Sequence, residues 1–151
     1  MDESEARAAS ESILSGWITQ GPRVAEFEAA FAGVVGADHA CAVSNCTAAM
    51  HLTLLAAGVG PGDEVITASH SFIATANSVR YCGAEPIFVD IDSGTFNMDP
   101  AKVQEAITDR TRAILCVHQM GMPCELDAIL GVARERGIAV IEDAACAAGS
   151  E

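Results

Sequence analysis

Residues 64–90 read EVITASHSFIATANSVRYCGAEPIFVD, and this stretch decides the fold class. Two short apolar runs, Glu64–Ala68 and Pro86–Asp90, flank a segment in which Ile73, Ala76 and Val79 recur at helical spacing. Continuous apolar runs of this length are typical of strands that are buried on both faces of a parallel sheet. A strand, a helix and a second strand in this order predict a right-handed βαβ unit.

The same alternation continues along the chain. Three further apolar runs are predicted strands: Cys41–Ser44, Ala113–Val117 and Ile138–Glu142. Apolar stripes predict three helices: Val24, Phe27, Phe31 and Val34 after Pro22; Val103, Ala106 and Ile107 after Asp99-Pro100; and Leu126, Ile129, Leu130 and Ala133 before Gly137. Residues 4–14 are weakly patterned as a helical arm. The whole pattern predicts an α/β fold, a mostly parallel sheet with helices on both faces.

Composition limits the function classes. The 151 residues are 50% hydrophobic, which is enough for a sizeable core, and 21 acidic against 8 basic residues give a net charge of −13. A surface this acidic repels phosphate backbones and anionic lipids, so binding to nucleic acid or to a membrane is not expected. The N-terminal MDESEAR lacks the basic and apolar features of an export signal, and no apolar run is long enough to span a bilayer. We therefore expect a soluble, cytoplasmic protein.

The six cysteines form no C-x-x-C pair, which favours reduced thiols over a disulfide framework. If Cys116 and His118 lie on a strand, they share one face, and Cys124 or Cys146 would then complete a zinc site. Because the paired short spacings of zinc motifs are missing, buried free cysteines are the favoured interpretation and no metal is expected.

Three segments follow predicted strands, where ligands of α/β sheets bind. In the first, Ser44–Leu52, Ser and Asn precede small residues, so the start of a helix either offers its N–H groups to a phosphate or is an ordinary capped helix. The glycines of Gly58–Gly62 precede a strand and lack the third glycine of a dinucleotide fingerprint, which argues against a nicotinamide dehydrogenase.

The second segment ends the strand at 138–142 with two acids, and Asp143 either meets a ligand cation or caps the next helix. In the third, Phe72 begins a helix after the strand at 64–68. Its ring is either part of the core or stacks on a planar heterocycle.

Taken together, these segments resemble the DegT/DnrJ/EryC1/StrS family of pyridoxal-phosphate sugar aminotransferases. The similar stretches are GWITQGPRVAEFEAAFA, AVSNCTAAMHLTLLAAGVGPGDEVI, SFIATANSVRYCGAEPIFVDID, NMDPAKVQEAIT, TRAILCVHQMGMPCELDAI and IAVIEDAACAAGSE. The resemblance covers the chain from about Gly16 to Glu151 and implies the large domain of aminotransferase fold type I. It also implies a domain plan in which residues 1–15 form a helical arm and residues 16–151 form part of the domain that binds pyridoxal 5'-phosphate, the rest of that domain and the small C-terminal domain being absent.

The resemblance implies roles for individual residues. Thr47 and Ala48 match the residues that hold the cofactor phosphate, and Phe72 matches the aromatic residue that stacks on the pyridine ring. Asp143 matches the aspartate that pairs with the pyridine nitrogen. Cys146 stands where many members have glutamine or histidine near the ring hydroxyl, so it is expected beside the cofactor with a weaker contact.

The resemblance also implies the substrates and the oligomeric state, and it implies that this chain lacks the catalytic lysine. Members use a nucleotide-linked keto sugar and an amino-acid donor, and they are homodimers when full length. The Schiff-base lysine of the family is expected beyond Glu151, and the only lysine in this chain is Lys102, so the catalytic residue is unknown and the chain alone is expected to be inactive. A dehydratase of the same family and a non-catalytic α/β binding or scaffold remnant remain alternatives.

Overall fold

The computed structural model describes residues 2–150. Met1 and Glu151, the first and last residues of the predicted domain plan, lie outside the described residues. Contacts within the chain divide it into two compact units, one that ends at Ala42 and one that begins at Val43.

The second unit is built on a four-stranded sheet of order β2-β1-β3-β4, in which every pairing is parallel. Its strands are β1 (Glu64–Ala68), β2 (Glu85–Val89), β3 (Thr111–Val117) and β4 (Ala139–Asp143). The predicted parallel α/β sheet is confirmed.

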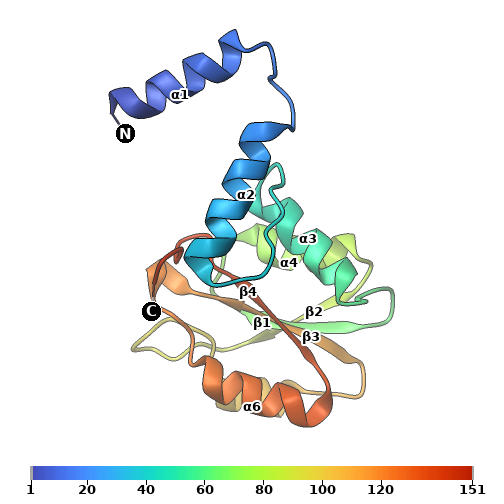
Figure 1. Ribbon diagram of the computed structural model, residues 1–151. Helices are drawn as coiled ribbons and strands as arrows, with labels where there is room; N and C mark the ends of the chain where they lie inside the picture. Colours follow the sequence, from blue (N-terminus) through green and yellow to red (C-terminus); the bar gives the residue numbers. More distant parts are fainter. Residues whose placement is uncertain (1, 151) are drawn as a thin grey trace. The chain divides into compact units, whose positions relative to one another are not determined.

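Helices cover both faces of this sheet (Figure 1). One face carries α3 (Cys46–Ala56) and α4 (Ile73–Tyr81), and the other carries α5 (Pro100–Ala106) and α6 (Leu126–Arg136). Neighbouring strand residues alternate between the two cores because successive side chains of a strand point to opposite faces. Leu115 thus packs under α3 and α4, whereas Ile114 and Cys116 pack against α5 and α6.

Local sequence signals set the helix ends as predicted. The Asp99 carboxylate caps α5 by accepting the Ala101 N–H at 2.8 Å, and Pro100 is the first helical residue. Gly137 ends α6 in the left-handed conformation, at φ +66°, where a side chain would be strained. Between β3 and α6 the chain also forms a short 3-10 turn, η1 (Gln119–Gly121).

The first unit contains two helices, α1 (Glu3–Leu14) and α2 (Pro22–Val35). The helix predicted to begin at Pro22 is confirmed, but its apolar stripe does not enter a core. Phe27 is 56% exposed and Val34 is 76% exposed, and Ala32 is the buried residue of α2. Phe27 instead stacks on Phe31, with ring centroids 5.7 Å apart.

The strand predicted at Cys41–Ser44 is wrong. A strand requires backbone partners on a neighbouring strand, and none of the described strands pairs with this segment. The Ala42 N–H donates instead to the Glu28 carboxylate of α2, at 2.8 Å. Two other strands are each shifted by one residue from the prediction, so that Asp143 is the last residue of β4.

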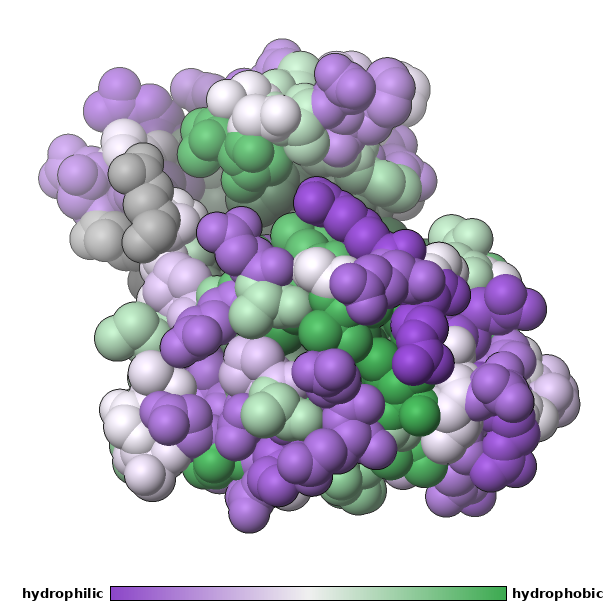
Figure 2. All heavy atoms as spheres, turned by 90° about the horizontal axis from the view of Figure 1, so that it is seen from below, coloured by the Kyte–Doolittle hydropathy of each residue, from purple (hydrophilic) through white to green (hydrophobic). Residues whose placement is uncertain are grey.

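No helix within residues 2–150 is both long and apolar enough to cross a membrane. Seen from the side of α6, the surface is mostly hydrophilic, with apolar side chains visible between the polar ones (Figure 2). The exposed positions of α6 include the charged Asp127, Arg134 and Glu135, which accounts for this polar face.

Candidate functional site

The candidate site lies at the carboxyl ends of the strands. Strands β1 and β3 are neighbours in the sheet, but the chain reaches β2 on the far side of β1 before it returns to form β3. Ligands of open α/β sheets bind at such a reversal of strand order, because the loops leave the two strands in opposite directions there. The loop after β1 leads to Phe72, and β4, next to β3, ends at Asp143.

Asp143 is buried, with 7% of its surface exposed, and its carboxylate is held from three segments. Oδ1 accepts hydrogen bonds from the Cys46 thiol at 3.4 Å and from the Ala145 N–H at 3.2 Å. Oδ2 lies 3.5 Å from the Thr75 hydroxyl. The alternative that Asp143 caps a following helix is wrong, because residues 145–149 form turns. A buried carboxylate with several donors is suited to hold a cationic partner.

Cys46 connects Asp143 to the first turn of α3. Partial burial of its sulfur raises the pKa of the Cys46 thiol, although the residue is exposed overall, and the negative charges of Asp143 and of the Cys146 thiol raise it further. A raised pKa keeps the thiol protonated, as it must be to donate to the carboxylate. The start of α3 and the end of β4 therefore meet directly.

The N-terminus of α3 is capped by Asn45, whose side chain accepts the Ala48 N–H at 2.9 Å. Of the two alternatives for this segment, the structure thus shows a capped helix, in which the Ala48 N–H is already used. Within the described chain no acceptor pairs with the N–H groups of Cys46 and Thr47. These two donors and the positive end of the helix dipole are suited to an anion.

Phe72 is the residue before α4 and is 76% exposed, while Ile73 next to it is 65% exposed. The interpretation of Phe72 as a core residue is therefore wrong, although Val79 of the same helix is fully buried. The ring lies at the carboxyl end of β1, where it is accessible to a ligand.

Sequence reasoning missed Ser71 and Thr75. Thr75 lies in α4 and is 1% exposed, and its hydroxyl is 2.7 Å from the hydroxyl of Ser71 as well as in contact with Asp143. The signal was present as two hydroxyl residues four apart, Ser71 in the loop before α4 and Thr75 in its first turn. The partner, Asp143, is 68 residues away, so the pattern alone does not reveal the contact.

The predicted cluster around His118 is a structural network. The His118 ring is 5% exposed, and its Nδ1 accepts the Cys124 N–H at 3.0 Å, so Nε2 carries the proton and donates to Glu142 at 2.9 Å. A hydrogen bond with Cys124 raises the pKa of the Cys116 thiol, and burial raises it further. No group of three or more metal-ligating side chains is arranged around a common point in residues 2–150.

Cysteine burial differs from the expectation. Cys82, Cys116 and Cys124 are buried free thiols, as predicted, but Cys146 is exposed, and so are Cys41 and Cys46. Cys146 lies in the turn after β4, at residues 145–149, where the neighbouring Ala147 is buried instead.

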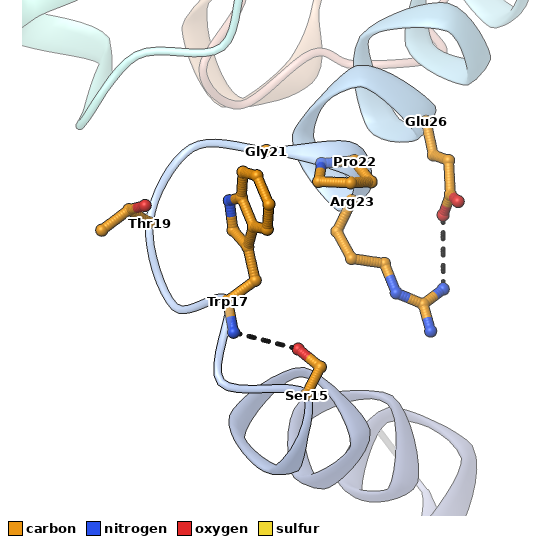
Figure 3. Close-up of a pocket in the computed structure, with 7 residues that line it drawn as sticks. All are labelled: Ser15, Trp17, Thr19, Gly21, Pro22, Arg23 and Glu26. Atoms are coloured by element: carbon orange, nitrogen blue, oxygen red, sulfur yellow. Dashed lines mark hydrogen bonds and ion pairs between the residues drawn. The ribbon is translucent and has the colours of Figure 1, made fainter.

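A separate pocket of about 430 Å³ lies in the first unit (Figure 3). The Trp17 indole lines it and donates to the Gln20 carbonyl at 3.0 Å, while Arg23 pairs with Glu26 and Glu11 at 3.3 Å each. Because Arg23 is neutralised by two carboxylates, the pocket has no free positive charge to offer an anion. None of the five predicted site residues lines it.

Lys102 does not have the environment of a nucleophilic amine. Its side chain is 47% exposed and pairs with Glu105 at 2.9 Å. The hydrogen bond to Glu105 raises the pKa of Lys102 and so keeps it protonated. A lysine that attacks a carbonyl needs a lowered pKa instead.

Comparison with known proteins places this geometry in a family. The chain is 50% identical over 143 residues to the spore coat polysaccharide biosynthesis protein SpsC of Bacillus subtilis, a match that covers 95% of this chain and 37% of SpsC. It is 50% identical over 151 residues to the GDP-perosamine synthase of Caulobacter vibrioides, covering 99% of this chain and 41% of that protein. The chain thus spans about two fifths of the length of these relatives.

Solved structures agree with the sequence matches. The crystal structure of NtdA from Bacillus subtilis with bound cofactor PMP superposes with a TM-score of 0.94 at 39% identity, covering 97% of this chain and 34% of NtdA. The sequence model of the DegT/DnrJ/EryC1/StrS aminotransferase family matches residues 1–151. The parallel sheet, the open helix start at Cys46 and the buried acid at Asp143 are thus found in a chain that belongs to the DegT/DnrJ/EryC1/StrS aminotransferase family.

Proposed function

We propose that this chain is the cofactor-binding part of a pyridoxal-phosphate aminotransferase that transfers an amino group from an amino acid to a nucleotide-linked keto sugar. The observation that carries the proposal is the direct contact between the start of α3 and the buried Asp143 carboxylate. The start of α3 is suited to bind an anion, and the carboxylate is suited to bind a cation. Pyridoxal phosphate has one group of each kind, a phosphate and a protonated pyridine nitrogen. The donor set of the site fits both ends of that molecule.

In this proposal the N–H groups of Cys46 and Thr47 hold the phosphate, and the Ala48 N–H, now bonded to Asn45, supports the same turn. The exposed ring of Phe72 stacks on the pyridine. Cys146, in the turn after β4, lies beside the ring in this proposal.

Asp143 has the central role. A carboxylate beside the ring nitrogen favours the protonated form of that nitrogen. When bound, the protonated cofactor supplies the electron sink that amino-group transfer requires. The protein's own part is to shield the carboxylate from water and to orient it.

We also propose that the active protein is a homodimer located in the cytoplasm. The exposed apolar residues of the first unit, such as Leu14 at 82% and Ile18 at 76%, support an interface there. The six unpaired cysteines support a reducing compartment.

The test of the cofactor site uses the amine form of the cofactor, pyridoxamine phosphate, which forms no bond with lysine. The dissociation constant is measured by absorbance and fluorescence titration for the wild-type chain and for Asp143→Ala. Loss of a charge-assisted hydrogen bond is expected to weaken binding about tenfold to hundredfold. Asp127→Ala is the matched control, because it removes an exposed acid from α6 on the other face of the sheet.

Inorganic phosphate serves as a second probe in the same titration. It is expected to compete with the amine form and to bind to Asp143→Ala at least as well as to wild type, because its site lies at α3 and the substitution removes a nearby negative charge. Equal affinity of wild type and Asp143→Ala for the amine form would disprove the proposed role of Asp143.

The proposal includes that this chain by itself does not transaminate, since its one lysine is an exposed, paired cation. Incubation with pyridoxal phosphate, borohydride treatment and peptide mapping are expected to leave less than stoichiometric label on Lys102. A stoichiometric label there, abolished in Lys102→Arg, would refute this part of the proposal.

A further inference from the structure

Both oxygens of the Asp143 carboxylate have protein donors, and they come from different parts of the chain. Oδ1 is reached by the Cys46 thiol and the Ala145 N–H, while Oδ2 is reached by the Thr75 hydroxyl of α4. An ionised carboxylate can only accept hydrogen bonds, so each of these groups must give its proton toward Asp143.

This requirement determines the direction of the hydrogen bond behind Thr75. Because the single hydroxyl proton of Thr75 points to Asp143, the 2.7 Å contact between Thr75 and Ser71 must have Ser71 as its donor. The result is an ordered relay in which Ser71 donates to Thr75 and Thr75 donates to Asp143. Thr75 is 1% exposed, so water does not replace this donor.

The backbone around the relay is itself constrained. The Ser78 hydroxyl donates to the Thr75 carbonyl at 2.7 Å, and the Thr75 N–H donates to the Phe72 carbonyl at 3.0 Å. The His118 N–H donates to the Asp143 carbonyl at 3.2 Å, which holds the other end of the relay. Ser71 is also the direct neighbour of Phe72. The relay therefore joins the loop that carries the exposed aromatic ring to the strand end that carries the acid.

We propose that Thr75, supported by Ser71, is a positioning residue that sets the orientation of the Asp143 carboxylate toward the pyridine nitrogen. This inference rests on the proposed function, because that proposal supplies the ligand. The hydrogen bonds among Ser71, Thr75 and Asp143 belong to the protein alone. Thr75 acts through Asp143 and does not itself touch the cofactor. Its loss leaves the phosphate seat at α3 intact.

The test compares Thr75→Val, which keeps the shape and removes the hydroxyl, with Thr75→Ser, which keeps the hydroxyl. Thr53→Val is the matched control, because the exposed Thr53 hydroxyl bonds only within α3, to the Ala49 carbonyl at 2.8 Å. Thermal unfolding of all three variants establishes that they fold. The affinity for pyridoxamine phosphate is expected to fall about tenfold in Thr75→Val, as for the loss of one hydrogen bond to an ion.

The affinity for inorganic phosphate is expected to stay unchanged in Thr75→Val, and Thr75→Ser is expected to restore cofactor affinity. A merely structural role for Thr75 would lower both affinities together. Equal cofactor affinity in wild type and Thr75→Val would overturn the inference.

A second readout needs no ligand. The Ala145 amide donates to Asp143 Oδ1, so its proton chemical shift and hydrogen-exchange rate report where the carboxylate lies. In the free chain, Thr75→Val is expected to shift this amide signal and speed its exchange, and Thr75→Ser is expected to return both toward wild type. An Ala145 amide unaffected by Thr75→Val would refute the relay, whereas failure of the wild-type chain to bind the cofactor would count against the proposed function alone.

Discussion

The Asp143 carboxylate controls the thiol that contacts it. Burial and the negative charge of Asp143 both raise the pKa of Cys46, so the reactive thiolate form is suppressed at neutral pH. The two causes are separable, because Asp143→Asn removes the charge and leaves the burial.

We predict that Asp143→Asn lowers the pKa of Cys46 and speeds its alkylation near neutral pH. The measurement is the rate of iodoacetamide labelling of Cys46 against pH, followed by peptide mass spectrometry, with the exposed Cys41 as internal reference. Asp127→Asn is the matched control and is expected to leave the rate unchanged. Slower labelling of Cys46 in Asp143→Asn would contradict the assignment.

The indole ring of Trp17 lies so close to Gly21 that a side chain at position 21 does not fit. A Cβ on Gly21 would lie 2.0 Å from Nε1 of Trp17, so a side chain there must displace the indole. Trp17 is the only tryptophan, and its Nε1 donates to the Gln20 carbonyl.

We predict that Gly21→Ala breaks this hydrogen bond and moves the tryptophan emission to longer wavelength, as the ring turns into water. Gly33→Ala is the control, because a Cβ at Gly33 of α2 meets nothing within 4 Å. It is expected to stabilise the helix by up to about 1 kcal/mol without changing the emission. An unchanged emission in Gly21→Ala would show that the contact is not populated.

Among the helices, α3 has two roles, since its first turn is both a capped terminus and the proposed phosphate seat. Asparagine and aspartate cap helices about equally well, and a negative charge near a helix N-terminus is favourable for stability. A charge at the same position repels a bound anion. Stability and binding therefore respond in opposite ways to a charge at residue 45.

We predict that Asn45→Asp leaves the free energy of unfolding within about 0.5 kcal/mol of wild type. The same variant is expected to weaken binding of inorganic phosphate and pyridoxamine phosphate about tenfold or more. Asp99→Asn makes the reverse change at the cap of α5, on the other face of the sheet, and is expected to change neither affinity. Unaltered phosphate binding in Asn45→Asp would place the anion seat elsewhere.

Three thiols of the molecule ionise less readily when the chain is folded, whereas the hydrogen bond with Cys116 lowers the pKa of Cys124 to about 6. Burial raises the pKa of Cys82, and the pKa values of Cys46 and Cys116 are raised as well, from an ordinary value of 9.0. A group whose pKa is higher in the folded state binds its proton more tightly there. Its contribution to stability is complete below the ordinary pKa and is lost as the pH rises above it.

We predict that the free energy of unfolding falls steadily as the pH rises above about 9, where the unfolded chain releases thiol protons that the folded chain retains. Chemical denaturation at a series of pH values measures the slope. Cys82→Ala is expected to make the slope shallower, because it removes one of these thiols from the core. A free energy that is flat or increasing in this range would contradict the prediction.

The parts of the fold that follow from the sequence are those with local causes. Asp99-Pro100 and Gly137 set helix ends through contacts within a few residues, so the neighbouring residues in the sequence are enough to predict their roles. The segment Cys41–Ser44 has the composition of a strand, but whether it becomes one depends on a partner strand that composition does not supply.

The sequence by itself determined the parallel α/β architecture and, through its resemblance to a family, the positions at which a cofactor is expected. The spacing of apolar residues and the turn residues act over short distances along the chain. The sequence alone therefore predicts the features that depend on them. Only the tertiary structure decided that Cys46 and Thr75, which are 97 and 68 residues from Asp143, both contact its carboxylate. Contacts of that kind are made when the sheet brings distant strand ends to one edge, and no local pattern in the chain encodes them.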